Sequence, residues 1–350
     1  MISASAERKY KMNRLIDNFG REISYLRVSI TDRCNYRCIY CQPEKPFNFI
    51  PHQEILRYEE IMEIIQEAVE LGISKVRITG GEPLARKGVT CFIRQLSKIK
   101  KLNDLSLTTN GFFLDEYAGQ LKEAGLKRVN VSLDSLQEEK YKKITRGGNL
   151  KKVLTGIHTA IAVGLLPVKI NTVVMRGVND DEIDDFVQLA LKYPINIRFI
   201  EFMPSTDVLS AEYKKGFISI LEIRDYLIKK YLLKPVKVDR GNGPARYYQL
   251  DGGKGTIGFI TALSQHFCES CNRVRLTSDG KIRPCLFSNR AIELKNELRN
   301  LEKTAKNTSH SRKKLIREKI IEAVKLKPAC HKLNIKEKND ISFQMSQIGG

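Results

Sequence analysis

The sequence has no long hydrophobic run, and its longest apolar stretches, such as 173–175 and 199–200, are only a few residues long. A helix that spans a bilayer needs about 18 consecutive apolar residues, so the sequence predicts no transmembrane helix and no membrane partner. The first twenty residues mix basic with acidic side chains and have no apolar core, which argues against a secretory signal. No low-complexity tract is present, and 42% hydrophobic residues in a chain of 350 can form one large core or two modest ones. We therefore expect a folded cytoplasmic protein.

Acidic residues are scarce relative to basic ones, with 40 Asp and Glu against 60 Lys and Arg, which gives a net charge of +20. Such a charge suggests nucleic acid, an anionic membrane or a phosphorylated substrate as a partner. Part of it is local, because the segment 290–340 holds fifteen basic and seven acidic residues. Lysine-rich helical faces are usually solvated surface, so the charge alone does not identify a partner.

Short apolar runs rich in β-branched residues alternate with longer amphipathic stretches, which predicts an α/β fold. Six strand-helix units in order indicate a parallel sheet, doubly wound or wrapped into a barrel, with the chemistry at the carboxyl ends of the strands. Beyond residue 231 the pattern changes to short strands and turns, followed by lysine-rich helices over 290–327. The predicted strands are Tyr25–Ile30, Lys75–Thr79, Leu105–Thr109, Arg128–Leu133, Val168–Val174 and Asn196–Phe202, and the predicted helices are Glu59–Leu71, Asp115–Gly125, Asp180–Lys192 and Phe217–Tyr231.

Three cysteines, Cys34, Cys38 and Cys41, follow the first predicted strand with three and then two residues between them. Disulfides are not expected in the cytoplasm, so this spacing points to a metal site. A structural zinc ion needs four ligands, and only His52 is near enough in sequence to complete the set. A four-iron four-sulfur cluster held by three cysteines leaves one iron open to a small molecule. The spacing favours the cluster, and Tyr40 could shield it or an adenine.

A second set, Cys268, Cys271 and Cys285, again offers three ligands. A zinc knuckle completed by His266 is one interpretation, and a second cluster with an iron open to substrate is the sharper one. Between these cysteines, Arg273 and Arg275 lie two positions apart on a predicted strand before a turn at residues 279–280, so they share a face. Two guanidinium groups beside a metal suit an anion or the edge of a purine.

The segment TDRCNYRCIYC resembles the signature of the radical S-adenosylmethionine superfamily, in which an aromatic residue precedes the last of three cysteines. GGEP, at residues 80–83, matches the next motif of that superfamily, in which Glu82 and the backbone meet the amino group of the methionine. The resemblance implies a cluster that binds S-adenosylmethionine and cleaves it to a 5'-deoxyadenosyl radical. It also implies an incomplete TIM-type (β/α)6 barrel with a C-terminal iron-sulfur subdomain of short strands and helices.

Further motifs narrow the resemblance to the GTP 3',8-cyclase (MoaA) family of molybdenum cofactor biosynthesis. They span residues 26–286 and the end of the chain: LRVSITDRCNYRCIYC, KVRITGGEPL, LTTNG, NVSLDSL, VKINTVV, IRFIEFMP, GPARYY, FCESCNRVRLTSDGKIRPCLF and IGG. Gln42, where the family more often has Met, and the lysine-rich segment 287–327 depart from the family pattern.

This resemblance implies roles for individual residues. The first cysteine set would hold the cluster that binds S-adenosylmethionine, and the second set a 4Fe-4S cluster that anchors the guanine of GTP. S-adenosylmethionine would contact Tyr40, Gly81, Ser132 and Met203. Positive charge around a triphosphate is physically required. The implied GTP contacts are Arg27, Lys75, Arg77, Thr108, Lys169 and Arg198, with Arg273, Val274 and Arg275 near the guanine.

The implied enzyme is a radical lyase or cyclase that abstracts the hydrogen at C3' of GTP. The C3' radical would attack C8, and reduction would complete (8S)-3',8-cyclo-7,8-dihydroguanosine 5'-triphosphate. The implied partners are a reductant protein and the cyclic pyranopterin monophosphate synthase that receives the product, without nucleic acid, in a monomer or homodimer. No side chain is expected to act as an acid or base, although the tail residues Gly349 and Gly350 resemble a family tail that enters the active site.

The expected organisation is a partial barrel over residues 1–215, a C-terminal domain over 216–340 with the second cluster, and an active-site tail over 341–350. Two other interpretations stay open on the residues alone. A two-cluster radical enzyme that modifies peptides would explain the cysteines but not the two arginines or the terminal glycines. A non-enzymatic iron-sulfur or zinc protein that binds nucleic acid would explain the charge and would cleave no S-adenosylmethionine.

Overall fold

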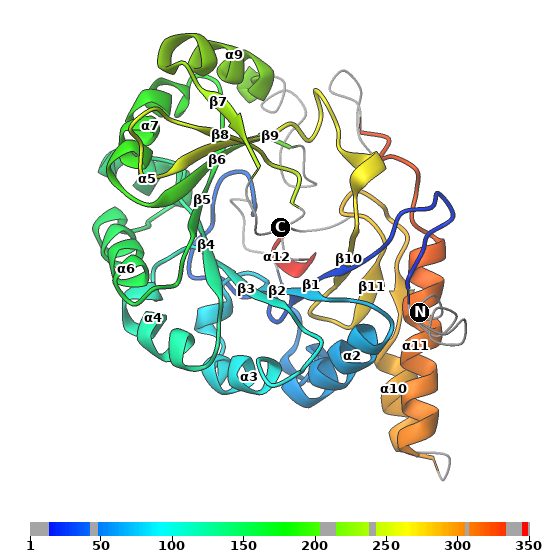
Figure 1. The fold of residues 1–350 in the computed structure, drawn as a ribbon. Coiled ribbons are helices and arrows are strands. Elements are labelled where there is room, and N and C mark those ends of the chain that lie inside the picture. The colour runs from blue at the N-terminus through cyan, green and yellow to red at the C-terminus, as the bar shows by residue number, and fades with distance from the viewer. Residues whose placement is uncertain are drawn as a thin grey trace, which may run out of the picture.

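The computed structural model describes residues 14–42, 48–203, 215–237, 243–304, 308–333 and 345–348. One curved sheet forms the centre of the molecule, and most helices lie along its outer side (Figure 1). No helix in these described ranges is both long enough and apolar enough to cross a membrane.

The six predicted strand-helix units are confirmed, with boundaries that differ by up to three residues. The strands are β1 (Tyr25–Ser29), β2 (Lys75–Thr79), β3 (Asp104–Thr109), β4 (Arg128–Ser132), β5 (Val168–Val174) and β6 (Ile195–Glu201). The helices along them are α2 (Tyr58–Glu70), α3 (Val89–Leu96), α4 (Leu114–Glu123), α5 (Glu138–Thr145), α6 (Leu150–Ala162) and α7 (Ile183–Lys192). Short 3-10 helices are η1 (His52–Glu54), η2 (Pro83–Ala85), η3 (Asp180–Glu182) and η4 (Cys268–Ser270).

Helix α2 shows why these segments fold as they do. Its apolar residues Ile61, Ile64 and Ile65 recur at helical spacing and are almost fully buried. The helix ends before Gly72, whose φ of 109° is a conformation that side chains with a Cβ rarely adopt. The apolar face therefore covers the sheet, and the chain turns directly into β2.

The C-terminal part of the chain extends the same sheet at both of its edges. It contributes α9 (Ile220–Tyr231), β7 (Lys234–Val236), β8 (Arg246–Gln249), β9 (Thr256–Ile260), β10 (Arg273–Leu276), β11 (Lys281–Arg283) and β12 (Ile292–Glu293). The strand order is β12-β11-β10-β1-β2-β3-β4-β5-β6-β9-β8-β7, so the sheet does not close on itself. Because β9 pairs parallel to β6 and β10 parallel to β1, the incomplete barrel gains one parallel strand on each side. The separate domain over 216–340 stays a prediction.

The lysine-rich segment forms α10 (Lys295–Glu302) and α11 (Ser309–Lys325), which lie beside α2 (Figure 1). Its arginines pair with glutamates of that helix: Arg312 reaches Glu63 at 2.6 Å, and Arg317 reaches Glu67 at 2.5 Å. Part of the local positive charge therefore joins the C-terminal helices to the barrel.

The two cysteine sets lie toward opposite ends of the parallel strands. The first set follows the carboxyl end of β1, whereas Cys271 precedes β10, which runs parallel to β1. Cys285 follows β11, which is antiparallel to β10 and therefore ends on the same side as Cys271. The expectation that all the chemistry gathers at the carboxyl ends of the strands is wrong for the second set, because β10 joins the sheet beside β1.

Candidate active site

Basic side chains fill the concave interior of the sheet. The register pairs Arg275 of β10 with Arg27 of β1, and Arg27 with Arg77 of β2. Paired residues on neighbouring strands project from the same face, so these three guanidinium groups form one row. Arg128 continues the row on β4, because Arg77 pairs with Ser106 and Ser106 with Arg128.

These arginine and lysine side chains are buried, although arginines and lysines are mostly exposed in folded proteins. The exposed fractions are 8% for Arg27, 8% for Lys75, 9% for Arg77, 4% for Arg128, 4% for Lys169, 6% for Arg198 and 4% for Arg275. Asp104 forms ion pairs with two members of this group, at 2.6 Å from Arg128 and 3.4 Å from Lys75. So many buried cations on one concave face suit a highly charged anion.

The pKa values inside the sheet reflect this excess of positive charge. Burial, and then the charges of Arg198 and Arg128, lower the pKa of Lys169 to about 6. Burial raises the pKa of Tyr25, but Arg77 and Arg27 outweigh it and bring the pKa to about 8. Neutral lysine and ionised tyrosine are both favoured where cations crowd together without counter-charge.

A cavity of about 170 Å³ opens among these residues. Its lining includes five of the predicted GTP contacts, which are Arg27, Arg77, Arg198, Arg273 and Arg275, together with Met203 from the end of β6. Lys75 on β2 and Lys169 on β5 lie on strands that line the cavity but are themselves outside the lining, and Thr108 on β3 is outside it as well. Val274 is 1% exposed and belongs to the hydrophobic core, so a contact of Val274 with guanine would be limited to its backbone.

All three cysteines of the second set line the same cavity. Burial would raise the pKa of Cys271, but the charges of Arg273 and Lys327 outweigh it and lower the pKa to about 6. Throughout the described part of the chain, no three His, Cys, Asp or Glu side chains lie close enough together to hold a single metal ion. A 4Fe-4S cluster accepts thiolates that are farther apart than the ligands of a single metal ion, because each thiolate binds a different iron.

The first cysteine set is held in a tight loop. The carbonyl of Cys38 accepts hydrogen bonds from the backbone N–H groups of Cys41, at 2.9 Å, and Gln42, at 3.1 Å. The sulfur of Cys34 accepts from the backbone of Tyr36 at 3.4 Å and from Asn110 Nδ2 at 3.7 Å. Burial, and then Glu82, raise the pKa of Cys34 to about 12. Thiolates in such surroundings need a positive partner, which a cluster iron supplies.

The GGEP loop packs directly against this cysteine loop. Gly81 donates its backbone N–H to Thr31 at 2.7 Å, and a Cβ added at Gly81 would lie 2.3 Å from the carbonyl oxygen of Arg33. Glu82 is fully buried and accepts hydrogen bonds from the Leu84 N–H at 2.9 Å and the Thr109 hydroxyl at 2.8 Å. In this structure the carboxylate of Glu82 connects the ends of β2 and β3.

Tyr40 points from the cysteine loop toward the end of β4. Its hydroxyl donates to Asp134 at 2.6 Å, two residues beyond Ser132, which ends β4. Tyr40 also packs against the cluster of Ile144, Met175 and Phe202. Two predicted S-adenosylmethionine contacts, Tyr40 and Ser132, are thus brought toward the same end of β4.

The tail contributes to the interior through α12 (Met345–Ile348), which contacts β1. Figure 1 shows α12 inside the curve of the sheet, and Met345 lines the cavity. The backbone of Ser278 donates to Gln347 at 3.3 Å. Gly349 and Gly350 lie outside the described residues, directly after this helix.

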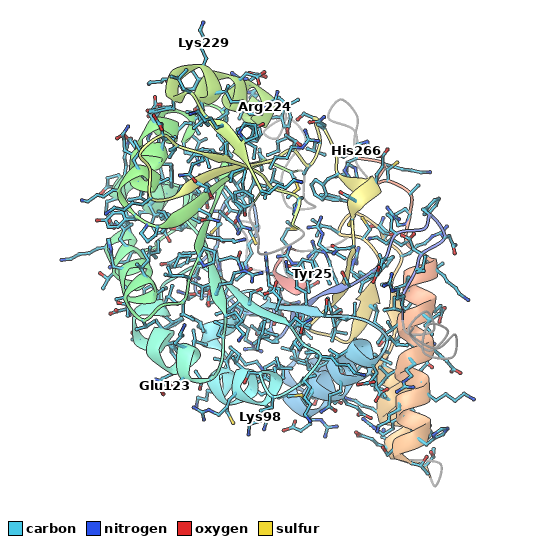
Figure 2. All side chains as sticks on the ribbon, viewed as in Figure 1. Tyr25, Lys98, Glu123, Arg224, Lys229 and His266 are labelled. Atoms are coloured by element: carbon cyan, nitrogen blue, oxygen red, sulfur yellow. The ribbon has the colours of Figure 1, made fainter. Side chains whose placement is uncertain are left out.

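Sequence reasoning missed four interior residues: Tyr25, Arg128, Asn130 and Lys327. The first three were detectable, because Tyr25 lies two positions before Arg27, and Arg128 and Asn130 lie four and two positions before Ser132. The structure places Asn130 at 2.7 Å from Arg198 and the ammonium of Lys75 over the ring of Tyr25, 4.6 Å from its centroid. Figure 2 shows Tyr25 inside the curve of the sheet, whereas Lys98 and Glu123 project outward.

Comparison with known families divides the chain into two matched parts. Residues 28–190 match the model of the radical SAM superfamily, and residues 195–333 match the model described as Molybdenum Cofactor Synthesis C. The GTP 3',8-cyclase of Petrotoga mobilis is 49% identical over 340 residues, which cover 96% of this chain and 100% of that protein. The GTP 3',8-cyclase of Thermodesulfovibrio yellowstonii is 49% identical over 336 residues, or 95% of this chain and 99% of that protein.

Solved structures share the fold at low sequence identity. SuiB of Streptococcus suis bound to S-adenosylmethionine superposes with a TM-score of 0.56 at 16% identity, covering 81% of this chain and 64% of that chain. The anSMEcpe structure with bound AdoMet gives a TM-score of 0.50 at 15% identity, covering 83% of this chain and 79% of that chain. These two likenesses concern the fold alone.

Proposed function

Because this chain belongs to the GTP 3',8-cyclases of the radical SAM superfamily, we propose how its own residues carry out the reaction of that family. It is a radical SAM enzyme of molybdenum cofactor biosynthesis that acts on GTP and forms (8S)-3',8-cyclo-7,8-dihydroguanosine 5'-triphosphate. Membership of the superfamily implies one 4Fe-4S cluster and S-adenosylmethionine.

The observation that carries the assignment of the substrate site is the row of buried cations in the sheet interior. A triphosphate brings about four negative charges, and Arg27, Arg77 and Arg198 line a cavity where cations outnumber carboxylates. Lys75 and Lys169 add positive charge behind this lining. These side chains project from strands, which hold a ligand more rigidly than loops do. We assign the triphosphate of GTP to this row.

We assign the first cluster to Cys34, Cys38 and Cys41, and S-adenosylmethionine to the surrounding ends of the strands. Tyr40, Gly81, Ser132 and Met203 would contact it, as the family resemblance implies. When bound, S-adenosylmethionine and this cluster supply the 5'-deoxyadenosyl radical that removes the hydrogen at C3' of GTP. The contribution of the protein is to hold the two molecules in register and to exclude water, since the cofactor performs the bond cleavage.

A second 4Fe-4S cluster on Cys268, Cys271 and Cys285 is a separate part of the proposal. The three thiols line the substrate cavity, and Arg273 and Arg275 project into it beside them. An iron without a protein ligand would face the cavity, where the guanine could bind while the two arginines contact its edge. Because the cysteine sets lie toward opposite ends of the strands, GTP would extend between them through the row of cations.

Further partners follow from the same chemistry. The reaction needs a one-electron reductant protein, and we propose that the product passes to a cyclic pyranopterin monophosphate synthase. Nucleic acid is not an expected partner, because the buried cations face inward. Monomer and homodimer are both compatible with this site.

A peptide-modifying radical enzyme is the competing class, and one anaerobic experiment separates it from the cyclase. The protein is reconstituted with iron and sulfide, reduced, and incubated with S-adenosylmethionine and GTP. We expect 5'-deoxyadenosine together with an isomer of GTP. Deoxyadenosine without conversion of GTP would favour the competing class, and neither product from a protein with full iron content would overturn the proposal.

The metal content tests the second cluster independently of activity. Two cubes correspond to about eight irons per chain. Cys285→Ala should lower the iron content by about half and leave the first cluster in place. Cys91→Ala is the matched control, because Cys91 is exposed on α3, away from both sets. A Cys285→Ala protein with the iron content of the unmodified protein would refute the second cluster.

A further inference from the structure

Lys327 is a buried lysine that neither the sequence motifs nor the proposed reaction uses. It follows α11 directly after the last turn, and 3% of its surface is exposed. Its ammonium donates to the backbone carbonyl of Arg273 at 2.8 Å and to that of Pro284 at 2.9 Å. Burying a lysine in this way is rare unless its charge has a partner.

The two acceptors belong to the two segments that carry the second cysteine set. Arg273 lies two residues after Cys271, and Pro284 directly precedes Cys285. One ammonium group therefore joins the start of β10 to the chain that follows β11. Lys327 also lines the cavity that the three cysteines line.

Lys327 differs in its partners from Arg21, another cation near the second cysteine set. Arg21 donates to the carbonyls of Cys268, at 2.7 Å, and Pro328, at 2.6 Å, and it is neutralised by Asp17 at 2.6 Å. Lys327 has only carbonyl partners, and no carboxylate of the described residues forms an ion pair with it. Burial lowers its pKa, and the groups that oppose this effect are Cys271 and Cys285.

A buried cation without an anion is expensive, so the positive charge at this position has to be matched by charge in the cavity. The groups near it that can carry negative charge are the side chains of Cys271 and Cys285. Three thiolates and a 4Fe-4S core form a unit of net negative charge. The ammonium would compensate this charge in the holoprotein, and it lacks that compensation when the cysteines are protonated.

We propose that Lys327 is a positioning residue for the second cluster. Lys327 joins the two segments that carry the cysteines and supplies the positive charge that a reduced, anionic cluster needs. This inference rests on the proposed assignment of the second cluster. It also gives the C-terminal helices a function that their sequence does not reveal, because α11 delivers Lys327 to the cavity. A cluster bound here would become more negative on taking one electron from the external reductant, and the positive charge of Lys327 would offset that added charge.

The test uses the full chain with the first cluster removed, so that signals come from the second site. In this parent, all three first-set cysteines are replaced: Cys34→Ala, Cys38→Ala and Cys41→Ala. Three substitutions are then compared. Lys327→Met removes charge and donors, Lys327→Gln keeps an amide donor without charge, and Lys327→Arg keeps the charge. Lys325→Met is the matched control, because Lys325 is exposed at the end of the same helix.

Each protein is reconstituted anaerobically and titrated with dithionite while the electron paramagnetic resonance signal of the reduced cluster is recorded. We expect Lys327→Met and Lys327→Gln to lower the equilibrium constant for reduction about tenfold, which is 59 mV for a one-electron couple. Lys327→Arg and Lys325→Met should stay within about twofold of the parent. Iron and sulfide content should fall most in Lys327→Met, which loses both the charge and the connection.

The outcomes separate the two proposals. A parent without iron would overturn the second cluster and this inference with it. A parent with a full cluster, and a Lys327→Met variant with the same cluster content and potential, would overturn the role of Lys327 alone. If Lys327→Met fails to assemble the cluster, Lys327→Arg and Lys327→Gln decide whether Lys327 acts through its charge. A cluster that assembles in Lys327→Arg but not in Lys327→Gln supports the proposed role of the charge, and failure to assemble in both variants overturns that role.

Discussion

Binding of GTP to the free protein should take up protons from solution. Burial and four neighbouring cations, including Arg198 and Arg128, hold the pKa of Lys169 at about 6. A triphosphate on the cation row supplies about four negative charges that offset these cations, so the pKa of Lys169 should rise well above 7.5, toward that of an ordinary lysine, about 10.4. The pKa of Tyr25, about 8 in the free protein, should rise as well.

These pKa values give the size of the effect. At pH 7.5 a lysine with a pKa of about 6 is about 3% protonated, so binding should take up about one proton at Lys169. A tyrosine with a pKa of about 8 is about one quarter ionised and adds about 0.2 proton. The terminal phosphate, with a second pKa of about 6, is already ionised and contributes little. The total uptake is about 1.2 protons at pH 7.5.

The affinity for GTP should fall as the pH rises, because binding takes up protons. The advantage that a protonated Lys169 gives to binding is fully present below pH 6 and is lost as the pH rises above 6. The dissociation constant for GTP should therefore increase about tenfold per pH unit between pH 7 and 8. At pH 6, where Lys169 without ligand and the terminal phosphate of free GTP are each about half protonated, the uptake of about half a proton at Lys169 should be offset by the proton that the phosphate releases, so the net uptake should fall close to zero.

Isothermal titration calorimetry measures this uptake directly. GTP is titrated into anaerobic protein at pH 7.5 in two buffers with different ionisation enthalpies, and the difference in heat gives the protons exchanged. Lys169→Met should reduce the uptake to the small share of Tyr25. Lys98→Met, on the outer surface in Figure 2, should leave it unchanged. Zero uptake at pH 7.5, or equal uptake in Lys169→Met, would refute the reasoning.

Three further predictions concern single positions. Gly81→Ala should displace the GGEP loop and abolish iron binding at the first cysteine set. Gly119→Ala, where α4 leaves open space for a Cβ, should instead raise the free energy of unfolding by up to about 1 kcal/mol. Thermal melting and iron analysis of both variants check these two outcomes. Tyr40→Phe removes the hydrogen bond to Asp134 and should reduce the free energy of unfolding by about 1.5–3 kcal/mol at pH 8. The loss should be smaller at pH 5, because burial raises the pKa of Asp134 to about 6 and its carboxyl is protonated there. Equal losses in urea unfolding at both pH values would count against this. Arg273→Ala should weaken GTP use more than S-adenosylmethionine binding, and equal loss of both in binding titrations would contradict the assigned roles.

The strands and the first cysteine loop were predictable because local patterns determine them. Each of the six barrel strands is a short buried run before a helix of regular apolar spacing, and its position in a parallel sheet follows from connection rules. The family resemblance assigned Arg27, Arg77 and Arg198 to one site, and alternation along each strand is the physical reason that they face the same interior. No interaction between distant segments was needed for these predictions.

The position of the second half of the chain could not be predicted in this way. Strand β10 pairs with β1, although 248 positions separate Tyr25 from its partner Arg273, and no local pattern encodes such a pairing. The same pairing turns the second cysteine set toward the amino ends of the strands. Lys327 escaped notice for a related reason, because a lysine in a lysine-rich segment looks like solvated surface until its acceptors, Arg273 and Pro284, are known.

The excess of basic residues divides by environment into groups with different consequences. On α11, Arg312 and Arg317 face glutamates of α2, so their charge is balanced inside the protein and stabilises the packing of two helices. The interior row that includes Arg27 and Arg77 is buried, and we propose that it binds the triphosphate of GTP. Lys327 is a third case, because the negative charge that compensates its ammonium has to come from the cysteines of the second set. A net charge of +20 therefore says little about partners until each cation is assigned to water, to a carboxylate or to a ligand.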